Sequence, residues 1–144
     1  MYKKVVVIGA GSWGTALAIL LASNGHNVTL WGYKKEHIEE LKNERENRKY
    51  LPGFDFPQKI QIEDNLSKAL ESAQFIVFAV PSHAFREIFQ RIFTLLSRNC
   101  FFVSAIKGVE NKTLLTMSQV MAEVIGESTQ NIIIRTLLLC LTDL

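Results

Sequence analysis

Three glycines near the N-terminus have the residue type and spacing that point most directly to chemistry. Residues 9–14 read Gly-Ala-Gly-Ser-Trp-Gly, with glycine at the first, third and sixth positions. In such a turn Gly9 permits the tight change of direction, Gly11 lets the backbone approach a pyrophosphate, and Gly14 lets a helix pack closely against the strand. The helix N-terminus then offers unpaired N–H groups and partial positive charge to the phosphates. The segment therefore predicts a dinucleotide-binding turn.

The surroundings of this turn distinguish that prediction from an ordinary strand–helix connection, because glycine spacing alone recurs by chance. Residues 3–8 form a β-branched run typical of a strand buried on both faces of a parallel sheet. Apolar side chains then recur at helical spacing, at Trp13, Ala16, Leu17, Leu20 and Leu21. A second strand at 28–31 follows at the distance of a βαβ unit. This order of elements favours the dinucleotide-binding turn.

The end of the second strand bears on the choice of cofactor. It reads Trp-Gly-Tyr-Lys-Lys over residues 31–35, and Glu36 is the first acid. An NAD-specific site usually places an acidic residue here to hold the ribose 2′-hydroxyl, whereas cations suit a 2′-phosphate, so NADP(H) is favoured and NAD(H) is allowed. Tyr33 could stack on adenine and keep its hydroxyl in water. The alternative, that Lys34 and Lys35 only begin a solvated helix, stays open.

Two further strands end in residues that could reach a ligand at the same edge of the sheet. Pro81 fixes the direction in which the chain leaves one strand, and Phe85 or His83 could then face the ligand, although a histidine at a helix start is more often structural. Lys107 lies between a buried strand and Gly108. Its ammonium could serve a phosphate or a carbonyl oxygen that gains charge during hydride transfer, and an ordinary surface lysine is the alternative.

Strands and helices alternate along the chain. We expect strands at 3–8, 28–31, 60–62, 75–80, 101–106 and 131–134, and helices from Trp13, over 36–48, over 66–72, from Phe85 to Leu96 and from Leu114 to Val124, the last capped by Asn111 or Thr113. Residues 51–57 are expected to be a loop, because they hold two prolines and a glycine. The alternation predicts an α/β, Rossmann-type, doubly wound and mainly parallel sheet with helices on both faces. Ligands bind such sheets beyond the carboxyl ends of the strands.

Composition limits the other classes of protein. A chain of 144 residues suits one domain with a real core, and a net charge of +2 gives no reason to expect nucleic acid or an anionic membrane as partner. Cys100 and Cys140 lie in apolar stretches and are expected to be reduced core thiols of a cytoplasmic protein, with no disulfide framework and no metal site. The N-terminus is not expected to be a signal peptide, and the apolar run at 132–141 is too short to cross a membrane.

With these features in place, the chain resembles the bacterial NAD(P)-dependent sn-glycerol-3-phosphate dehydrogenases over residues 4–134. The glycine segment with its serine and tryptophan and the Tyr-Leu-Pro-Gly loop carry most of the specificity. The matching segments, in family order, are residues 8–18, Asn24-Gly25-His26, Leu30-Trp31-Gly32, Tyr50-Leu51-Pro52-Gly53, Val80-Pro81-Ser82 and Ile106-Lys107-Gly108.

The resemblance implies reversible reduction of dihydroxyacetone phosphate to sn-glycerol 3-phosphate, a reaction that feeds phospholipid synthesis. It implies that Ser12 and Trp13 bind the dinucleotide at the pyrophosphate turn, that Tyr33 contacts its adenosine side and that Phe85 lies near it. Lys107 matches a lysine that touches both the cofactor and the phosphate-bearing substrate. The proton-donating lysine of the family belongs to a C-terminal helical domain, so no catalytic residue is assigned here. The resemblance also allows a homodimer in full-length members.

The sequence departs from the family after Ile134. The family continues with a Ser-Gly-Pro-Ser/Thr-Phe-Ala segment and then the helical domain, whereas residues 135–140 read Arg-Thr-Leu-Leu-Leu-Cys. Arg-Thr-Leu can be encoded AGG-ACC-CTN, whose bases one position on read Gly-Pro and the start of a serine codon. We therefore expect a domain over 1–134 and an atypical tail over 135–144 that a single-base frameshift would explain; sequencing the gene across codon 134 tests this. A stand-alone dinucleotide-binding module and a non-functional truncated product are the alternatives.

Overall fold

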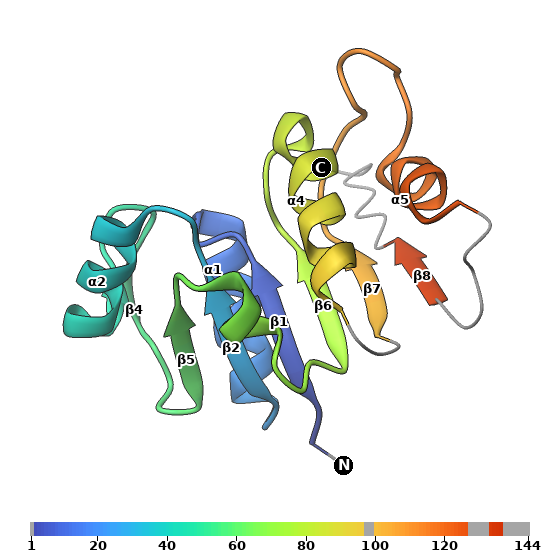
Figure 1. Ribbon diagram of the computed structural model, residues 1–144. Coiled ribbons are helices and arrows are strands. Elements are labelled where there is room, and N and C mark those ends of the chain that lie inside the picture. The colour runs from blue at the N-terminus through green and yellow to red at the C-terminus, as the bar shows by residue number, and fades with distance from the viewer. Residues whose placement is uncertain (1, 97–99, 127–132, 137–144) are drawn as a thin grey trace, which may run out of the picture.

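The computed structural model describes residues 2–96, 100–126 and 133–136, and its centre is a six-stranded parallel sheet (Figure 1). The strand order is β5-β2-β1-β6-β7-β8. The strands are β1 (Lys4–Ile8), β2 (Asn27–Trp31), β5 (Ile60–Glu63), β6 (Phe75–Phe78), β7 (Phe101–Ser104) and β8 (Ile133–Thr136). The helices are α1 (Ser12–Ser23), α2 (Lys35–Glu44), α3 (Leu66–Leu70), α4 (Ser82–Leu95) and α5 (Met117–Ile125). The predicted Rossmann-type fold is confirmed.

The strand order places the reversal of the sheet between β1 and β6. The chain runs outward from β1 through β2 to β5, then returns to the other side of β1 and continues from β6 through β7 to β8. Val5 of β1 has Val28 of β2 on one side and Phe75 of β6 on the other. A crevice for ligands forms at such a switch point, outside the carboxyl ends of the strands.

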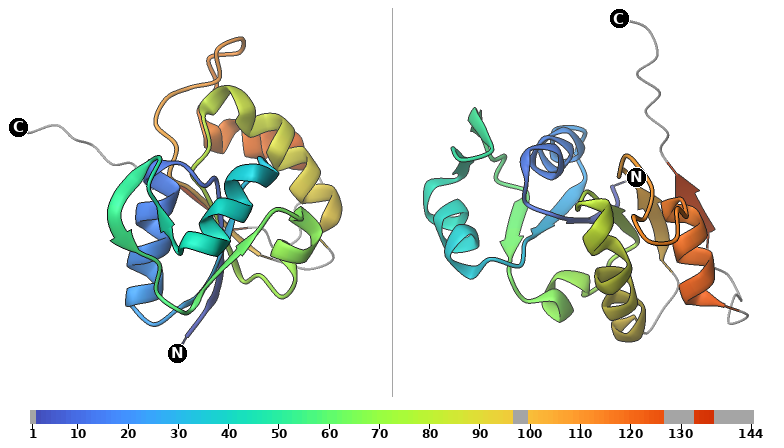
Figure 2. Two further views of the ribbon diagram at one scale, coloured as in Figure 1. Left: turned by 90° about the vertical axis from the view of Figure 1, so that its left-hand side faces the viewer. Right: turned by 90° about the horizontal axis from the view of Figure 1, so that it is seen from above.

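Alternating side chains of β1 serve two separate cores. Val5 and Val7 pack with the apolar residues of α1 and α2, whereas Val6 and Ile8 pack with those of α3, α4 and α5. The right-hand view of Figure 2 shows α1 on one side of the sheet and α3 and α4 on the other. A strand with apolar residues at successive positions is what burial on both faces requires.

Four fully buried phenylalanines hold α4 against β6 and β7: Phe78, Phe85, Phe89 and Phe102. The ring centroids of Phe78 and Phe85 are 5.1 Å apart in an edge-on arrangement, and those of Phe89 and Phe102 are also 5.1 Å apart. Such aromatic pairs add about 0.5–1.5 kcal/mol beyond the area they bury. This cluster fixes the position of α4, which forms one wall of the cleft described below.

The stretch after α2 differs from the sequence prediction. Residues 51–57 were expected to be a loop, but β4 (Leu51–Asp55) pairs antiparallel with β3 (Glu46–Asn47), and Pro52 is tolerated because this hairpin has free edges. The helix expected to reach Arg48 ends at Glu44, where Arg45 adopts a left-handed φ of 54°. The Arg45 guanidinium donates to the carbonyl oxygens of Pro57 and Ile60, at 2.8 and 3.0 Å. These contacts lie 12 and 15 residues away in sequence, so local periodicity could not predict the helix end.

The last described helix also begins later than expected. α5 starts at Met117, and its N-cap is Thr116, which forms a capping box with Gln119. Asn111 and Thr113 are therefore not its caps, and Leu114 is exposed with a left-handed φ of 58°. A Thr-x-x-Gln pattern before an apolar run is a capping-box signal, so the sequence did contain the correct start.

The single cysteine of the described residues, Cys100, lies in the core beside the start of β7. Cys100 is buried, and its thiol donates to the Ala73 carbonyl oxygen at 3.2 Å. Strand β8 continues pairing with β7 through Thr136, two residues beyond the boundary expected at Ile134, while residues 137–144, with Cys140, lie outside the described residues. Among the described residues no helix is long and apolar enough to span a membrane, and no cluster of potential metal ligands is found.

Replacing Phe89 by alanine tests the role of the phenylalanine cluster. We expect Phe89→Ala to lower the free energy of unfolding by about 3–5 kcal/mol, because it removes a fully buried ring and leaves a cavity. Phe54→Ala is the matched control, since Phe54 is 55% exposed, and it should change stability by about 0.5 kcal/mol or less. Urea denaturation measures both, and a loss below about 1 kcal/mol for Phe89→Ala would contradict the assignment.

Candidate dinucleotide-binding cleft

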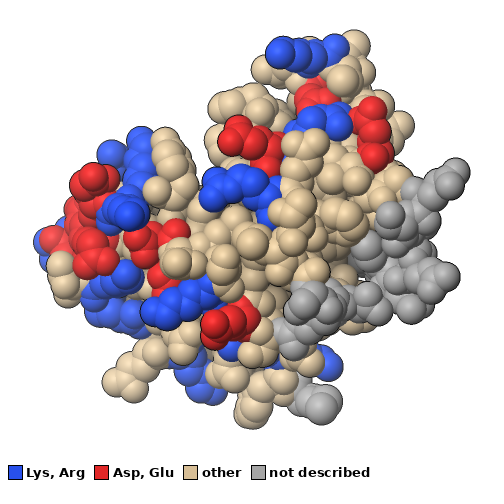
Figure 3. Space-filling view, viewed as in Figure 1, with Lys and Arg blue, Asp and Glu red and all other residues tan. Residues whose placement is uncertain are grey.

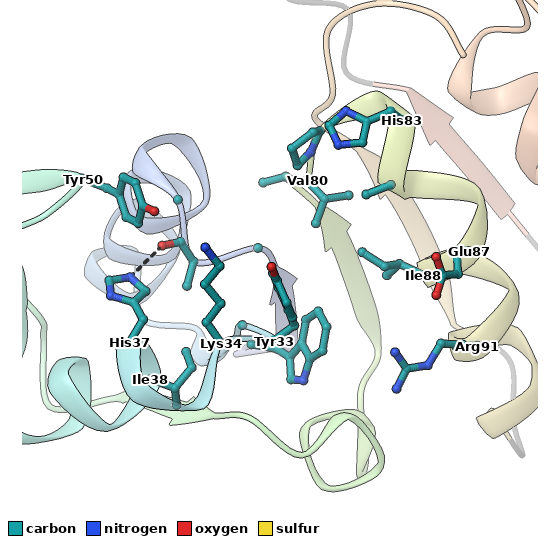
Figure 4. Close-up of a pocket in the computed structure, with 18 residues that line it drawn as sticks. Tyr33, Lys34, His37, Ile38, Tyr50, Val80, His83, Glu87, Ile88 and Arg91 are labelled. Atoms are coloured by element: carbon teal, nitrogen blue, oxygen red, sulfur yellow. Dashed lines mark hydrogen bonds between the residues drawn. The ribbon is translucent and has the colours of Figure 1, made fainter. Parts of the chain in front are cut away.

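A cleft of about 520 Å³ lies at the carboxyl ends of β1, β2 and β6, at the switch point of the sheet. Its floor is the glycine turn, one wall comes from the end of β2, α2 and Tyr50, and the opposite wall comes from the end of β6 and α4 (Figure 4). The space-filling view shows the hollow between the two halves of the molecule, with Lys and Arg side chains on both sides of it (Figure 3). The cleft is therefore open to solvent and flanked by Lys and Arg side chains, and the acidic residue Glu87 of α4 also lines it.

The three motif glycines meet different constraints. Gly9 has a φ of 120°, and a Cβ on it would lie 2.6 Å from the Ala79 carbonyl oxygen; a Cβ on Gly14 would lie 1.8 Å from the carbonyl oxygen of Gly9. A Cβ on Gly11 would meet nothing within 4 Å. The fold itself requires Gly9 and Gly14, whereas the open space at Gly11 leaves room for a ligand to approach the backbone.

Gly11 is also the N-cap of α1, and no side chain caps this helix end. The first-turn acids that often complement a helix N-terminus are absent from α1 as well. The hydroxyl of Ser12 is already engaged, because it donates to the Tyr50 carbonyl oxygen at 2.7 Å. The N-terminal N–H groups of α1 and their partial positive charge thus face the cleft without a competing anion from the helix itself.

Two residues that the sequence did not single out hold the glycine turn in place. The side-chain amide of Asn47, fully buried, donates to the Ala10 carbonyl oxygen at 3.1 Å and to the Thr15 hydroxyl at 2.7 Å. Nε2 of His37 lies 3.4 Å from the same Ala10 oxygen, and the His37 ring packs edge-on against Tyr50 (Figure 4). Both residues lie in the charged stretch expected to be a solvated helix, so the burial of Asn47 and the partial burial of His37 had no signal in local composition.

The wall formed by β2 and α2 is cationic. Tyr33 and Lys34 line the cleft, and Nζ of Lys34 lies 5.8 Å from the centroid of the exposed Tyr33 ring. None of the described residues that line this wall is acidic. Gly32 packs closely against α2, since a Cβ on it would lie 2.7 Å from Ile38 Cδ1. Lys35, in contrast, does not line this cleft. The wall lacks the carboxylate that an NAD-specific site usually offers to the ribose.

Of the residues expected at the wall formed by β6 and α4, some line the cleft and one does not. Pro81 and His83 line the cleft, followed along α4 by Ala84, Ile88 and Arg91. This spacing of four and three residues is one face of a helix. Phe85 lies on a different face: its side chain is fully buried against Phe78 in the core and does not line the cleft.

The other expected site residues lie beside the cleft rather than along it. Trp13 is 43% exposed, and its indole N–H donates to the Ala105 carbonyl oxygen at 2.9 Å, just beyond the end of β7. Lys107 follows two residues later and is exposed. The structure thus brings Gly9, Gly11, Tyr33, Lys34 and Pro81 together as cleft lining. Ser12, Trp13, Gly14, Phe85 and Lys107 are not among the residues that line the cleft.

A parallel sheet in this strand order, with a glycine turn at its switch point, defines a Rossmann-type dinucleotide-binding domain. Residues 4–135 match the family described as the N-terminus of NAD-dependent glycerol-3-phosphate dehydrogenase, and the chain belongs to that family.

Individual relatives carry the same name. The chain is 50% identical over 120 residues to a glycerol-3-phosphate dehydrogenase [NAD(P)+] of Desulfotalea psychrophila, a match that covers 83% of this chain and 35% of the relative. It is 46% identical over 128 residues to that of Pelotomaculum thermopropionicum, covering 89% of this chain and 37% of the relative. The chain therefore spans about a third of the length of these curated relatives.

Solved structures agree with the fold. A crystal structure of glycerol-3-phosphate dehydrogenase from Coxiella burnetii superposes with a TM-score of 0.82 at 34% identity, over 88% of this chain and 38% of that one. The structure of the Saccharomyces cerevisiae enzyme gives a TM-score of 0.75 at 27% identity, over 86% of this chain and 39% of that one.

The contrast between Gly11 and Gly14 yields a test of the turn. We expect Gly11→Val to weaken dinucleotide binding at least tenfold while changing the free energy of unfolding by only about 1 kcal/mol, the size of a helix-cap effect. Gly14→Ala should instead destabilise the fold itself, because its Cβ would collide with the Gly9 carbonyl oxygen. Fluorescence titration with NADPH and urea denaturation separate the two effects. Unimpaired binding by Gly11→Val would contradict the placement of the pyrophosphate.

Proposed function

We propose that this chain is the dinucleotide-binding part of an enzyme that interconverts dihydroxyacetone phosphate and sn-glycerol 3-phosphate with NAD(P)H. The observation that carries the proposal is the open Gly11 position at the uncapped N-terminus of α1, within a cleft at the switch point of the sheet. Family membership supports the reaction, since the curated relatives bear the name of this enzyme. The same family relation supports a role in supplying phospholipid synthesis.

The residues of the chain fit two parts of a dinucleotide separately, its central pyrophosphate and its adenosine end. The N–H groups at the start of α1 suit the pyrophosphate, and the room beside Gly11 allows it to come close. Tyr33 offers an aromatic face to adenine, and Lys34 offers a cation to a 2′-phosphate on the adenosine ribose. We therefore favour NADP(H) over NAD(H) as the cofactor.

Lys107 is the residue of this chain that we assign to both cofactor and substrate. NADPH, when bound, would supply a hydride to the substrate carbonyl carbon, and the carbonyl oxygen would gain negative charge until it is protonated. An ammonium group near that oxygen stabilises the charge as it develops, and the same group can pair with a substrate phosphate. The proton donor is assigned to a part of the enzyme outside residues 1–144, where the relatives continue.

Cofactor preference is tested at Lys34 with Lys35 as the matched control. We expect Lys34→Ala to lower the ratio of NADPH to NADH affinity about tenfold, because it removes a cation next to the proposed 2′-phosphate, and about 1.4 kcal/mol corresponds to that factor. Lys35→Ala should leave the ratio within about twofold, since Lys35 does not line the cleft. Paired titrations with the two cofactors provide the measurement. An unchanged ratio in Lys34→Ala would refute the preference for NADP(H).

A second test separates binding from turnover. We expect the polypeptide of 144 residues to bind NADPH but not to oxidise it when dihydroxyacetone phosphate is added. The reason is that residues 4–135 match only the N-terminal part of the enzyme. The absorbance of NADPH measures its oxidation. Measurable turnover would overturn the assignment of the proton donor outside this chain. A failure to bind either dinucleotide would instead refute the proposed function and favour a non-functional product. Binding without turnover is expected both for the dinucleotide-binding part of the enzyme and for a stand-alone NADP(H)-binding module.

A further inference from the structure

The segment that carries Lys107 has no helix or strand of its own. It runs from Ala105, after β7, to Thr116, before α5, and its one strand-like contact is a bridge between Val109 and Thr116. The side chain of Lys107 is exposed, and among the described residues it makes no hydrogen bond or ion pair. The position of its ammonium therefore depends on how the backbone of this segment is held.

Arg86 of α4 binds this segment at Glu110 through one edge of its guanidinium, which pairs with both carboxylate oxygens. Nε donates to one carboxylate oxygen at 2.7 Å, and Nη2 donates to the other at 2.8 Å. Nη2 also donates to a carboxylate oxygen of Glu123, on α5, at 2.6 Å. A two-point guanidinium–carboxylate pair fixes direction as well as distance, and the pair with Arg86 holds the pKa of Glu110 down at about 2.

Glu110 is in turn the centre of a closed turn three residues after Lys107. Its N–H donates to the Leu115 carbonyl oxygen at 2.8 Å, and its own carbonyl oxygen accepts from the Leu114 N–H at 2.8 Å. The hydroxyl of Thr113 donates to the carboxylate that Arg86 holds. Holding the Glu110 side chain in place therefore also restrains the backbone of this turn.

The opposite end of the segment is anchored from the glycine turn. The indole N–H of Trp13 donates to the Ala105 carbonyl oxygen at 2.9 Å, and the N–H of Ala105 donates to the Phe78 carbonyl oxygen at 2.9 Å. Lys107 therefore lies between an anchor on the sheet and an anchor on α4. Ala84 and Ile88, which lie two residues before and two residues after Arg86 in α4, line the cleft.

We propose that Arg86 is a positioning residue that fixes Lys107 at the cofactor and substrate edge of the sheet by holding Glu110. This inference rests on the proposed function, because it takes Lys107 as the group that meets the ligand. Arg86 bonds α4, which is one wall of the cleft, to the segment that carries Lys107, and this bond fixes the position of the segment relative to the cleft. Glu123 contributes a second carboxylate to Arg86 from outside the segment and is not needed for the position of Lys107.

A double-mutant cycle at Arg86 and Lys107 tests the coupling. Arg86→Gln and Lys107→Gln are each expected to weaken NADPH binding about fivefold, roughly 1 kcal/mol, while the double variant binds no more weakly than Lys107→Gln alone. Glu110→Gln should reproduce Arg86→Gln, and Glu123→Gln, the matched control, should stay within twofold of the unaltered chain. Exchanging the charges, with Arg86→Glu and Glu110→Arg together in a Glu123→Gln background that removes the like charge beside position 86, should recover most of the affinity. The proposal would be overturned if the losses of NADPH affinity in Arg86→Gln and Lys107→Gln added up in the double variant. It would also be overturned if Glu123→Gln lost as much affinity as Arg86→Gln.

Hydrogen exchange without cofactor keeps this test separate from that of the proposed function. Arg86→Gln should raise the exchange of the hydrogen-bonded backbone amides of Glu110 and Leu114 at least tenfold while leaving those of β1 and α1 unchanged. Unchanged exchange at these two amides would overturn the positioning role whether or not the chain binds NADPH. If the unaltered chain binds no dinucleotide, the proposed function fails, and the exchange result still shows whether Arg86 holds the segment.

Discussion

The cleft depends on the close approach of α1 to the end of β1. The Cα of Gly14 lies so near the carbonyl oxygen of Gly9 that a Cβ would come within 1.8 Å of it, and a Cβ on Gly9 would lie 2.6 Å from the carbonyl oxygen of Ala79 at the neighbouring strand end. This packing directs the N-terminus of α1 at the switch point of the sheet. The space left open at Gly11 and the uncapped N–H groups beside it follow from that approach.

The rest of the structure supports this arrangement from two sides. On one side Asn47 and His37 contact the Ala10 carbonyl oxygen, so the β3–β4 hairpin and α2 hold the turn from outside the sheet. On the other side the phenylalanine cluster fixes α4, which brings Ile88 and Arg91 to the cleft and Arg86 to the segment after β7. The walls of the cleft and the segment that carries Lys107 are thus parts of one packed unit.

The sequence was sufficient to predict the fold, because the fold depends on local patterns, and the same kind of pattern predicts a site at the glycine turn. Apolar runs and helical spacing mark the strands and helices of a parallel sheet, and the glycine spacing marks the turn. What could not be predicted depends on contacts between distant residues. Arg45 ends α2 through carbonyl oxygens of Pro57 and Ile60, and buried Asn47 lies in a stretch whose composition is that of a solvated helix.

Phe85 and Arg86 show the same limit at the level of single residues. The family resemblance placed Phe85 near the cofactor, but its helical phase turns the ring into the core, where it meets Phe78 at 5.1 Å. Arg86 gave no motif, since its importance comes from Glu110 and Glu123, which lie 24 and 37 residues further along the chain. Spacing within a helix predicts which residues share a face, but not what that face meets.

Amide chemical shifts recorded by NMR during titration with NADPH give the most direct test of the central claim. If the pyrophosphate binds at the N-terminus of α1, the largest shifts should fall on the amides of residues 11–13, with a second group at Tyr33 and Lys34. The amides of α5, which lies away from the cleft, should change little. Saturable shifts confined to other parts of the chain, or none at residues 11–13, would contradict the assignment of this turn as a dinucleotide site.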